Sequence, residues 1–439
     1  MAGLAPALQG SAGASVAASR GRRLARMPRH GLPRAAADVC IPPSAQARPP
    51  ESPGGAAAEF HMRSCVALQG RGMGHCAAES RIRPRARRPF AGPAGSAGCG
   101  IRQGFGLADR AGTGREMVRV HAPARLHFGF LDLHGGLGRR FGSIGVAVDA
   151  PSIDLTVAAA PDLAVEADGA ALAPERERIR RYAEAAARQI GVPAAGAFRL
   201  RAGIPAHAGF GSGTQLALSV AAGLAALHGA AFAPAAFADA LDRGNRSGVG
   251  LAAFVTGGLI VDGGRDAGGA PPPIVARLPY PEAWRILLLL DPAETGVHGA
   301  QERHAFQALP RFPAGEAAEI CRIVLMQVLP AAVAGTIEPF GRGITEIQRR
   351  IGDYFAPHQG GRFASRAVAA ALAEIEALGI PGFGQSSWGP TGFALLGSAA
   401  EAEALAARLR RSHPGLTLLV ARGRNRGAAV TREPAPAQA

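Results

Sequence analysis

The sequence predicts an α+β fold that is divided into two domains. Strand-like and helix-like segments follow one another without strict alternation, which favours mixed sheets covered on one face by helices. A buried strand-like run, "WRILLLLDP" at 284–292, marks the opening of a second domain. The chain of 439 residues is 48% hydrophobic, which is enough to build the cores of two or three ordinary domains.

Residues 1–116 differ in composition from the rest of the chain. They hold 17 arginines and 6 acidic residues, which is +11 of the total charge of +15, and they show no helix or strand period. We therefore expect this segment to be disordered. Three explanations are open: an organelle transit peptide, an arm that binds nucleic acid, and an upstream start codon with the working protein beginning at Met117. Composition favours the last.

The other 323 residues carry a net charge of only +4 (31 arginines minus 27 acidic residues) and lack runs of aromatic residues. This argues against nucleic acid as a partner of the globular part. The chain has no lysine, which excludes a Schiff-base lysine and the lysine of a P-loop NTPase. Four of the five cysteines lie in the first 116 residues at spacings that match no zinc or redox pattern. We expect a reducing, cytoplasmic environment without disulfides.

The predicted N-terminal domain spans residues 117–281. "VRVHAPARLHFGF", "SIGVAV" and "SIDLTVAA" are each typical of a strand, and "PERERIRRYAEAAARQIGV" predicts an amphipathic helix ending at Gly191. A strand at 197–202 precedes a glycine-rich loop and a helix from Thr214 to His228. A short helix (235–243), a helical "LAAFVTG" and a hairpin-like "GLIVDGGR" complete the domain.

The predicted C-terminal domain spans residues 282–431, and residues 432–439 are expected to form a tail. The strand at 284–292 is followed by helices at 315–334, 337–354 and 363–378, a loop "GFGQSSWGPTGF", a helix at 400–412 and a strand "LTLLVAR". Residues 216–238 contain no charged side chain, but their continuous helix is shorter than the roughly 20 residues of a membrane span. We expect no membrane association.

The loop "PAHAGFGSGTQ" at 205–215 stands directly before a helix. Unpaired amide groups at a helix N-terminus favour an anion, and glycines permit close approach and positive φ. The predicted phosphate-binding residues of this loop are His207, Gly209, Gly211, Ser212, Gly213 and Thr214. The alternative to an anion-binding site is an ordinary helix cap with a tight turn. The spacing matches neither the P-loop nor the dinucleotide-binding pattern.

Three motifs together resemble the GHMP small-molecule kinase superfamily: "APARLHFGFLDLHGG" (122–136), the loop at 205–212 and "GFGQSSWGPTGF" (382–393). This resemblance covers about residues 118–422. It implies a GHMP-kinase-like two-domain fold, with a ribosomal protein S5 domain 2-like N-terminal domain and a ferredoxin-like C-terminal domain. Many members carry a catalytic aspartate in a Ser-Gly-x-Asp segment, and "RSGVGLAAF" places Gly250 there. A glycine cannot accept a proton.

The motifs "RLHFGFLDLHG", "HAGFGSGTQ", "NRSGVG" and "GQSSWGPTGFA" resemble a non-kinase branch, the β-ribofuranosylaminobenzene 5′-phosphate synthase family. This resemblance implies transfer from phosphoribosyl diphosphate to 4-aminobenzoate or 4-hydroxybenzoate, with release of CO₂ and diphosphate. It implies a place in tetrahydromethanopterin biosynthesis and one-carbon metabolism. The alternative is an ATP-dependent small-molecule kinase in which Asp132 or Asp242 replaces the missing base.

The synthase-like chemistry suggests roles for individual residues. Arg125, His127 and Asp132 are the catalytic candidates, and Arg246 joins the loop in binding the diphosphate. Trp388 offers a stacking face to the aryl acid, and Ser386 and Ser387 offer hydroxyl donors. Further candidates for phosphate or proton chemistry are Arg139, Arg140, Arg243 and His134.

We expect Mg²⁺ as the only cofactor, with Asp132 as a ligand, and no organic cofactor. A zinc site at His298, Glu302 and His304 is not favoured, because a third convincing ligand is missing. The expected partners are small-molecule substrates. A homodimer is compatible with the sequence but is not specified by it.

Overall fold

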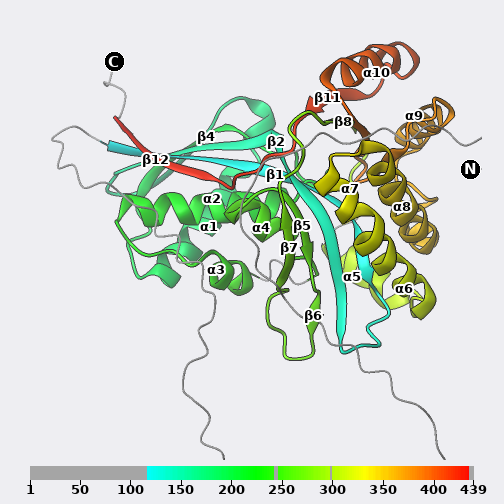
Figure 1. Cartoon of the computed structure of the whole chain (residues 1–439). Coiled ribbons are helices and arrows are strands. Elements are labelled where there is room, and N and C mark those ends of the chain that lie inside the picture. Colours follow the sequence, from blue (N-terminus) through cyan, green and yellow to red (C-terminus); the bar gives the residue numbers. More distant parts are fainter. Residues whose placement is uncertain (1–115, 242–245, 297–298, 435–439) are drawn as a thin grey trace, which may run out of the picture. The chain divides into compact units, whose positions relative to one another are not determined.

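The computed structural model describes residues 116–434 except 242–245 and 297–298. The expected disorder of residues 1–115 lies outside this range. A sheet of eight strands, in the order β12-β1-β2-β4-β3 with β5, β6 and β7 attached beyond β2, forms the first layer (Figure 1). Its strands are β1 (Glu116–Asp132), β2 (Arg139–Ala158), β3 (Leu163–Ala167), β4 (Gly196–Ala202), β5 (Leu259–Asp262), β6 (Arg265–Asp266), β7 (Ile274–Leu278) and β12 (Ala429–Pro434).

Two long antiparallel strands, β1 and β2, replace the shorter strands that the sequence predicts. "SIGVAV" and "SIDLTVAA" were expected as separate strands, but both belong to β2. Pro151 lies where the pairing with β1 shifts register between Pro123 and Ala124. A proline is tolerated at such a bulge, so it bends the strand without ending it.

Two other predictions need correction. "GLIVDGGR" does not fold back on itself, because β5 pairs with β2 and β7, and β6 pairs with β2. Residues 432–434, expected in a tail, form the end of β12, whose residues 429–434 pair with β1. The C-terminal end of the described chain therefore completes the N-terminal sheet.

Helices cover this sheet and share its core with the strands. They are η1 (Ala170–Leu172), α1 (Glu175–Ile190), α2 (Ser212–Leu227), α3 (Pro234–Ala240) and α4 (Val249–Val255). Helix α1 ends at Gly191 in the left-handed conformation, as its sequence predicts. Helix α2 is almost wholly buried, and this burial explains its lack of charge.

The C-terminal sheet has the order β11-β8-β10-β9, and its helices lie on the side of the molecule away from α1 (Figure 1). Its strands are β8 (Arg285–Leu290), β9 (Gly382–Gln385), β10 (Gly392–Leu396) and β11 (Thr417–Ala421). The helical segments are α5 (Gly299–Ala308), α6 (Ala314–Ile323), the π-helical η2 (Val324–Val328), α7 (Leu329–Ala334), α8 (Ile337–Gln359), α9 (Arg366–Ala377) and α10 (Ala399–Ser412).

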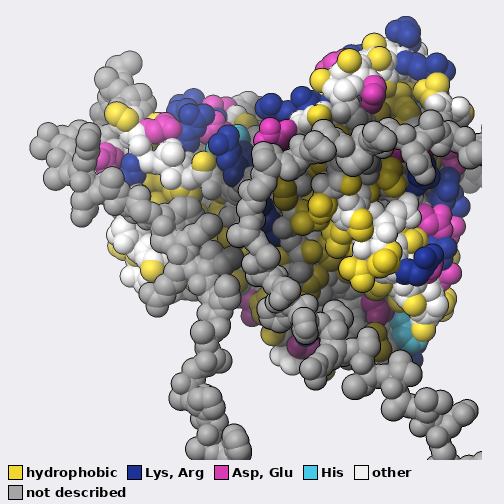
Figure 2. Space-filling view, in the orientation of Figure 1, with side chains coloured by type: hydrophobic (Ala, Val, Ile, Leu, Met, Phe, Trp, Pro, Cys, Tyr) yellow, Lys and Arg dark blue, Asp and Glu magenta, His cyan; other side chains and the backbone are white. Residues whose placement is uncertain are grey.

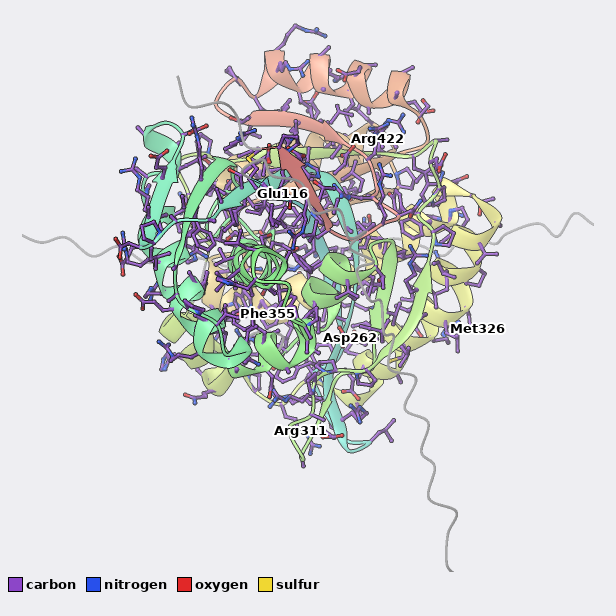
Figure 3. All side chains as sticks on the ribbon, turned by 90° about the vertical axis from the view of Figure 1, so that its left-hand side faces the viewer. Glu116, Asp262, Arg311, Met326, Phe355 and Arg422 are labelled. Carbon is purple, nitrogen blue, oxygen red and sulfur yellow. The ribbon has the colours of Figure 1, made fainter. Side chains whose placement is uncertain are left out.

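One helical run among the described residues, Ala314–Ala334, has the length and composition of a membrane span, with a mean hydropathy of 1.6. It combines α6, η2 and α7, and its inner face packs on α8 and β1. Leu325, Met326 and Val333 are exposed, and Figure 2 shows hydrophobic side chains gathered on the face that carries α7. Figure 3 shows Met326 at the periphery, whereas Phe355 and Asp262 are buried.

Candidate active site

A cleft of about 860 Å³ lies where the glycine-rich loop meets the segment that carries Trp388. Its walls come from β1, α1, the loop at 207–214, residues 246–250, α5 and residues 387–389. The volume is within the range of small-molecule sites. Segments that are far apart in the sequence are therefore brought to a single cavity.

The backbone of the loop determines the shape of one wall. Gly209 and Gly211 have φ of +87° and +72°, which side chains other than glycine rarely adopt. A Cβ on Gly209 would stand 2.2 Å from the carbonyl oxygen of Ser386. Helix α2 starts at Ser212 without a side-chain cap. Ser212, Gly213 and Thr214 of its first turn line the cleft, which places a helix N-terminus at the wall, where an anion is favoured.

Arg125 supports this loop from within the protein. Its guanidinium donates a hydrogen bond to the carbonyl oxygen of Gly209, and its backbone amide donates to that of Phe210 over 3.1 Å. Burial lowers the pKa of Arg125 to about 10. The side chain therefore remains a cation at neutral pH and places a positive charge beneath the loop.

Five predicted site residues that the structure describes do not line the cleft: Ser386, Asp132 and the further candidates Arg139, Arg140 and His134. Ser386 is fully buried, and its hydroxyl donates to the carbonyl oxygen of Gly209 (2.7 Å) and accepts from the amide of His127 (3.0 Å). Ser386 was predicted to contact an aryl acid, but its hydroxyl is buried and hydrogen-bonded within the protein. Asp132 lies at the far end of β1, where its carboxylate accepts from the amide of Gly135 over 2.8 Å. The structure does not bring it to the predicted catalytic and metal-binding position.

Two acidic residues hold the segment around Arg246 in place: Glu302, which lines the cleft, and Asp262, which is buried behind it. Arg246 forms an ion pair of 2.6 Å with Glu302 and lies 5.2 Å from the ring centre of Phe306. Buried Asp262 accepts from the amide of Gly248 over 2.9 Å and from the hydroxyl of Ser143. Asp262 thereby fixes the segment that carries Arg246, and burial raises the pKa of its carboxyl.

An aromatic recess forms another part of the cleft. We use this name for Phe130, Phe141, Phe306, Phe355 and Trp388. The ring centres of Trp388 and Phe355 are 4.2 Å apart, and those of Trp388 and Phe306 are 5.5 Å apart. A recess of this kind offers flat apolar surfaces to a ring-shaped ligand.

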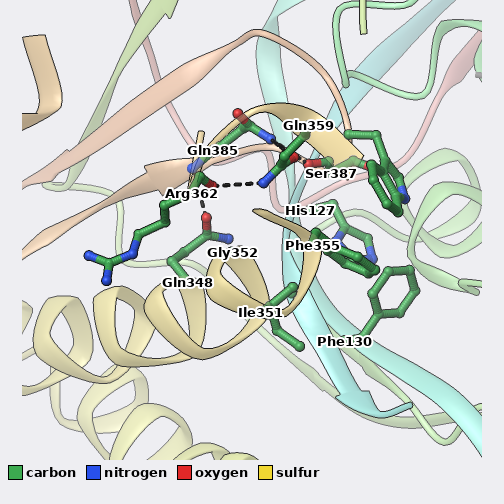
Figure 4. A pocket seen from close by; sticks show the side chains of 12 residues that line it. His127, Phe130, Gln348, Ile351, Gly352, Phe355, Gln359, Arg362, Gln385 and Ser387 are labelled. Carbon is green, nitrogen blue, oxygen red and sulfur yellow. Dashed lines mark hydrogen bonds between the residues drawn. The ribbon is translucent and has the colours of Figure 1, made fainter. Parts of the chain in front are cut away.

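A small inner cavity of about 20 Å³, with room for about one water molecule, adjoins the recess. In Figure 4, His127, Phe130 and Phe355 gather on one side of it and glutamines on the other. The glutamine amides are used internally: the carbonyl oxygen of the Gln348 side chain accepts from the amide of Gln385 over 2.7 Å. These glutamines therefore form a fixed, hydrogen-bonded wall of the inner cavity.

Two ring nitrogens between the recess and the inner cavity have no hydrogen-bond partner within the described structure. They are Nε2 of His127 and Nε1 of Trp388, and both side chains are buried. Burial, and then the charge of Arg125, keep the pKa of His127 well below its usual value. Its imidazole is therefore neutral at pH 7. Unpaired buried polar atoms are costly, so each of these nitrogens is a potential hydrogen-bonding group at the edge of the recess.

Backbone strain is concentrated at the same cleft. Among the described residues, those other than glycine with positive φ are Phe141 (74°), His207 (56°) and Ser387 (58°), and all line the cleft. Such conformations cost about 1–3 kcal/mol each and tend to persist where function requires them. His207 and Ser387 are both predicted site residues.

Gly250 also lines the cleft, at the position where the resemblance to kinases expects an aspartate. A Cβ there would lie 3.7 Å from Cγ2 of Thr214, which is an ordinary contact distance. The space for a side chain is present, but the carboxylate is not. Asp242, Arg243 and His298 fall outside the described residues. Within the described part of the chain, no group of three or more metal-binding side chains occurs.

Comparison with known proteins supports the fold. Models of the GHMP kinase N-terminal and C-terminal domains match residues 177–258 and 328–415. Mevalonate pyrophosphate decarboxylase from Streptococcus pyogenes is structurally similar with a TM-score of 0.52 at 13% identity, covering 71% of this chain and 98% of that one. Homoserine kinase from Cytophaga hutchinsonii gives 0.50 at 16%, covering 74% and 100%. These likenesses confirm the predicted fold class and nothing finer.

Sequence relatives are more specific. The β-ribofuranosylphenol 5′-phosphate synthase of Methanothermobacter thermautotrophicus is 32% identical over 333 residues, covering 70% of this chain and 97% of that protein. The synthase of the same name from Archaeoglobus fulgidus is 33% identical over 245 residues, covering 53% and 75%. The resemblance seen in the motifs is therefore confirmed. The chain belongs to the β-ribofuranosylphenol 5′-phosphate synthase family, a family of pentosyltransferase-type enzymes within the GHMP kinase superfamily.

Proposed function

We propose that this enzyme transfers the phosphoribosyl group of phosphoribosyl diphosphate to the ring of 4-hydroxybenzoate or 4-aminobenzoate. CO₂ and diphosphate are the other products, and the reaction belongs to tetrahydromethanopterin biosynthesis in the cytoplasm. The supporting observation is a single cleft that is lined both by an uncapped glycine loop and by an aromatic recess. The name of the related synthases specifies a ribosylated phenol, which is what transfer to 4-hydroxybenzoate yields.

The reaction balances without an added proton or oxidant. The C1–oxygen bond of the donor breaks, and diphosphate leaves with the electron pair. The ring carbon that bears the carboxylate forms a bond to C1. The bond to the carboxylate then breaks, its electrons restore the aromatic ring, and CO₂ departs.

The loop and its arginines stabilise the leaving diphosphate. The first amides of α2 and the cations Arg125 and Arg246 face the charge that develops as the C1–oxygen bond breaks. Because the loop is held by Arg125 and Ser386, these donors need little reorganisation. Gly250 leaves no carboxylate there to activate an alcohol, which distinguishes this cleft from that of a kinase.

The aromatic recess positions the acceptor. Trp388 and Phe355 supply faces for the ring, and the free nitrogens of His127 and Trp388 supply neutral hydrogen-bonding groups. Neutral partners suit a carboxylate that must leave as CO₂, since a strong ion pair would stabilise the starting carboxylate.

Magnesium fits this site chiefly as a companion of the donor. Among the described residues that line the cleft, Glu302 is the acidic side chain, and it is paired with Arg246. Diphosphate oxygens would therefore supply most ligands of the ion, with the hydroxyls of Ser212 and Thr214 nearby. The bound ion would neutralise part of the diphosphate charge.

The test is an end-product assay with the full chain. Phosphoribosyl diphosphate, Mg²⁺ and an aryl acid labelled in its carboxyl group should yield labelled CO₂ and diphosphate in equal amounts, and neither without the aryl acid. Parallel reactions with ATP and small alcohols should yield no ADP. ADP formation without an aryl acid would instead establish the kinase alternative.

A further inference from the structure

Helix α1 presents two arginines to the cleft, and neither belongs to one of the glycine-bearing motifs. Arg178 and Arg181 line the cleft together with Tyr182. The two arginines are three residues apart, so they lie on the same face of the helix. Helix α1 packs on α2 and lies on the side of the molecule away from α8 and α9 (Figure 1).

Arg178 is held in place. One terminal nitrogen of its guanidinium lies 2.8 Å from each carboxylate oxygen of Glu175, and the two side chains are only 19% and 12% exposed. A guanidinium has five N–H groups, so donors remain after this ion pair. The position of Arg178 is thus fixed before any ligand arrives.

Arg181 is different, because it is exposed and forms no ion pair with any residue that the structure describes. Among the described residues that line the cleft, four are arginines and one, Glu302, is acidic. Glu302 forms its ion pair with Arg246. The guanidinium of Arg125 donates its hydrogen bond to the loop, at the carbonyl oxygen of Gly209. Arg181 is therefore a cation in the cleft whose charge is not yet compensated within the described structure.

The donor of the proposed function has two anionic groups on opposite sides of its ribose, and the glycine loop accounts for only one. We propose that Arg181, assisted by Arg178, binds the 5′-phosphate of phosphoribosyl diphosphate, while the loop at 209–214 binds the diphosphate. This inference rests on the proposed function and adds a second phosphate subsite to it. A planar guanidinium binds phosphate through two parallel hydrogen bonds.

This arrangement also orients the sugar. Residues 386–389 touch the loop at Gly209, and they carry Trp388 of the aromatic recess. With the 5′-phosphate at α1 and the diphosphate at the loop, C1 lies on the side of the recess. The two phosphate subsites thereby present the reacting carbon to the acceptor.

The test measures binding of three probes by calorimetry in the presence of Mg²⁺: ribose 5-phosphate, inorganic diphosphate and phosphoribosyl diphosphate. In Arg181→Gln, the affinities for ribose 5-phosphate and phosphoribosyl diphosphate should fall about tenfold, because a charged hydrogen-bond pair is lost, and that for diphosphate should hardly change. Arg181→Lys should recover part of the loss. Ser212→Tyr, which obstructs the loop, should show the opposite pattern.

Arg188→Gln is the matched control, since Arg188 lies in the last turn of the same helix and does not line the cleft. It should bind all three probes as the unsubstituted enzyme does. Unchanged ribose 5-phosphate binding in Arg181→Gln, or equal loss of both simple probes, would overturn the second subsite. Continued release of CO₂ and diphosphate in that case would leave the proposed function intact.

Discussion

The two ends of the cleft differ in what forms their surface, which is mainly backbone at the donor end and side chains at the acceptor end. The donor end is a contiguous piece of backbone, residues 207–214, in which glycine conformations and amide groups form the surface. The acceptor end consists of side chains from β1, from the start of β2, from α5 and α8, and from the segment that bears Trp388. One end is local in sequence, and the other exists only after folding.

This difference predicts how each end responds to substitution. The loop of the donor end should be sensitive to an added Cβ at its positive-φ glycines, because its backbone forms the surface. The acceptor end should be sensitive to ring size and tolerant of local backbone changes. Substitutions at each end therefore separate the two responses.

Gly209→Ala should cause the greatest loss of activity. The added Cβ would stand 2.2 Å from the carbonyl oxygen of Ser386, at a residue whose φ is +87°. The loop must shift, so kcat/KM for phosphoribosyl diphosphate should fall by at least about 100-fold, as when a preorganised donor is lost. Steady-state kinetics, with thermal unfolding to verify folding, measure this.

Gly229→Ala is the control for backbone strain. Gly229 has φ of +62° and open space around its Cβ position. It should lose about 1–2 kcal/mol of stability from the left-handed conformation and keep its kinetics. Similar kinetic losses in both variants would mean that strain, rather than obstruction of the loop, is responsible.

Trp388→Ala should act on the acceptor alone. Removing a buried ring 4.2 Å from that of Phe355 should raise KM for the aryl acid about 10- to 100-fold, since buried aromatic contacts of this type contribute about 2 kcal/mol or more to binding. KM for the donor should stay within about twofold, a range typical of a residue outside its site.

The chain's other tryptophan supplies the matched control. Trp284 is equally buried but packs on Tyr280 and Phe340 outside the cleft. Trp284→Phe should lower stability and leave both KM values unchanged. If Trp388→Ala impaired the donor as much as the acid, the division of the cleft into two ends would not hold.

The sequence indicated the donor end because its signal is local. Glycines, hydroxyls and a helix start occur within a dozen residues, and the same loop appears in the structure. Trp388 was also identified, through the motif that carries it. Phe306 and Phe355 gave no signal, because an aromatic residue on an amphipathic helix looks the same whether it fills a core or lines a recess.

Charge patterns were misleading for a similar reason. Asp132 attracted attention because it stands between His127 and His134, yet of these three residues only His127 lines the cleft, and the end of β1 carries Asp132 away from it. Glu302 and Asp262, which hold Arg246 and its segment, come from α5 and β5. Only tertiary pairing reveals such supporting residues, and the same holds for Arg181 on α1.

Asp262→Asn tests whether support of the Arg246 segment matters to the donor. The carboxylate accepts from the amides of Gly248 and Gly264 over 2.9 and 3.0 Å, and an amide group would turn a donor toward one of them. The free energy of unfolding should fall by about 1–3 kcal/mol, and KM for the donor should rise several-fold. Calorimetric and kinetic measurements on one preparation give both values.

The exposed ion pair of Asp168 with Arg199 provides the comparison. Asp168→Asn should change stability by less than about 0.5 kcal/mol and leave KM unaltered. A raised KM for the aryl acid, rather than the donor, in Asp262→Asn would show that this carboxylate supports the other end of the cleft.

The smallest effect concerns pH and the acceptor end. Burial holds the pKa of His127 well below 6.5, so the folded protein keeps this imidazole neutral while the unfolded chain protonates it below that pH. The unfolded state then binds more protons, and the free energy of unfolding should decrease as the pH falls below 6.5. The contribution of one such group is at most about 1.4 kcal/mol per pH unit.

His127→Gln should remove this contribution, so its unfolding free energy should depend less on pH between about 5 and 6.5 than that of the unsubstituted enzyme. Urea unfolding over a pH series measures the two slopes. His121, whose pKa burial also lowers, is present in both proteins and cancels in the comparison. Equal slopes would mean that the imidazole is protonated in the folded state. The acceptor end would then hold a cation, and its electrostatic contrast with the donor end would disappear.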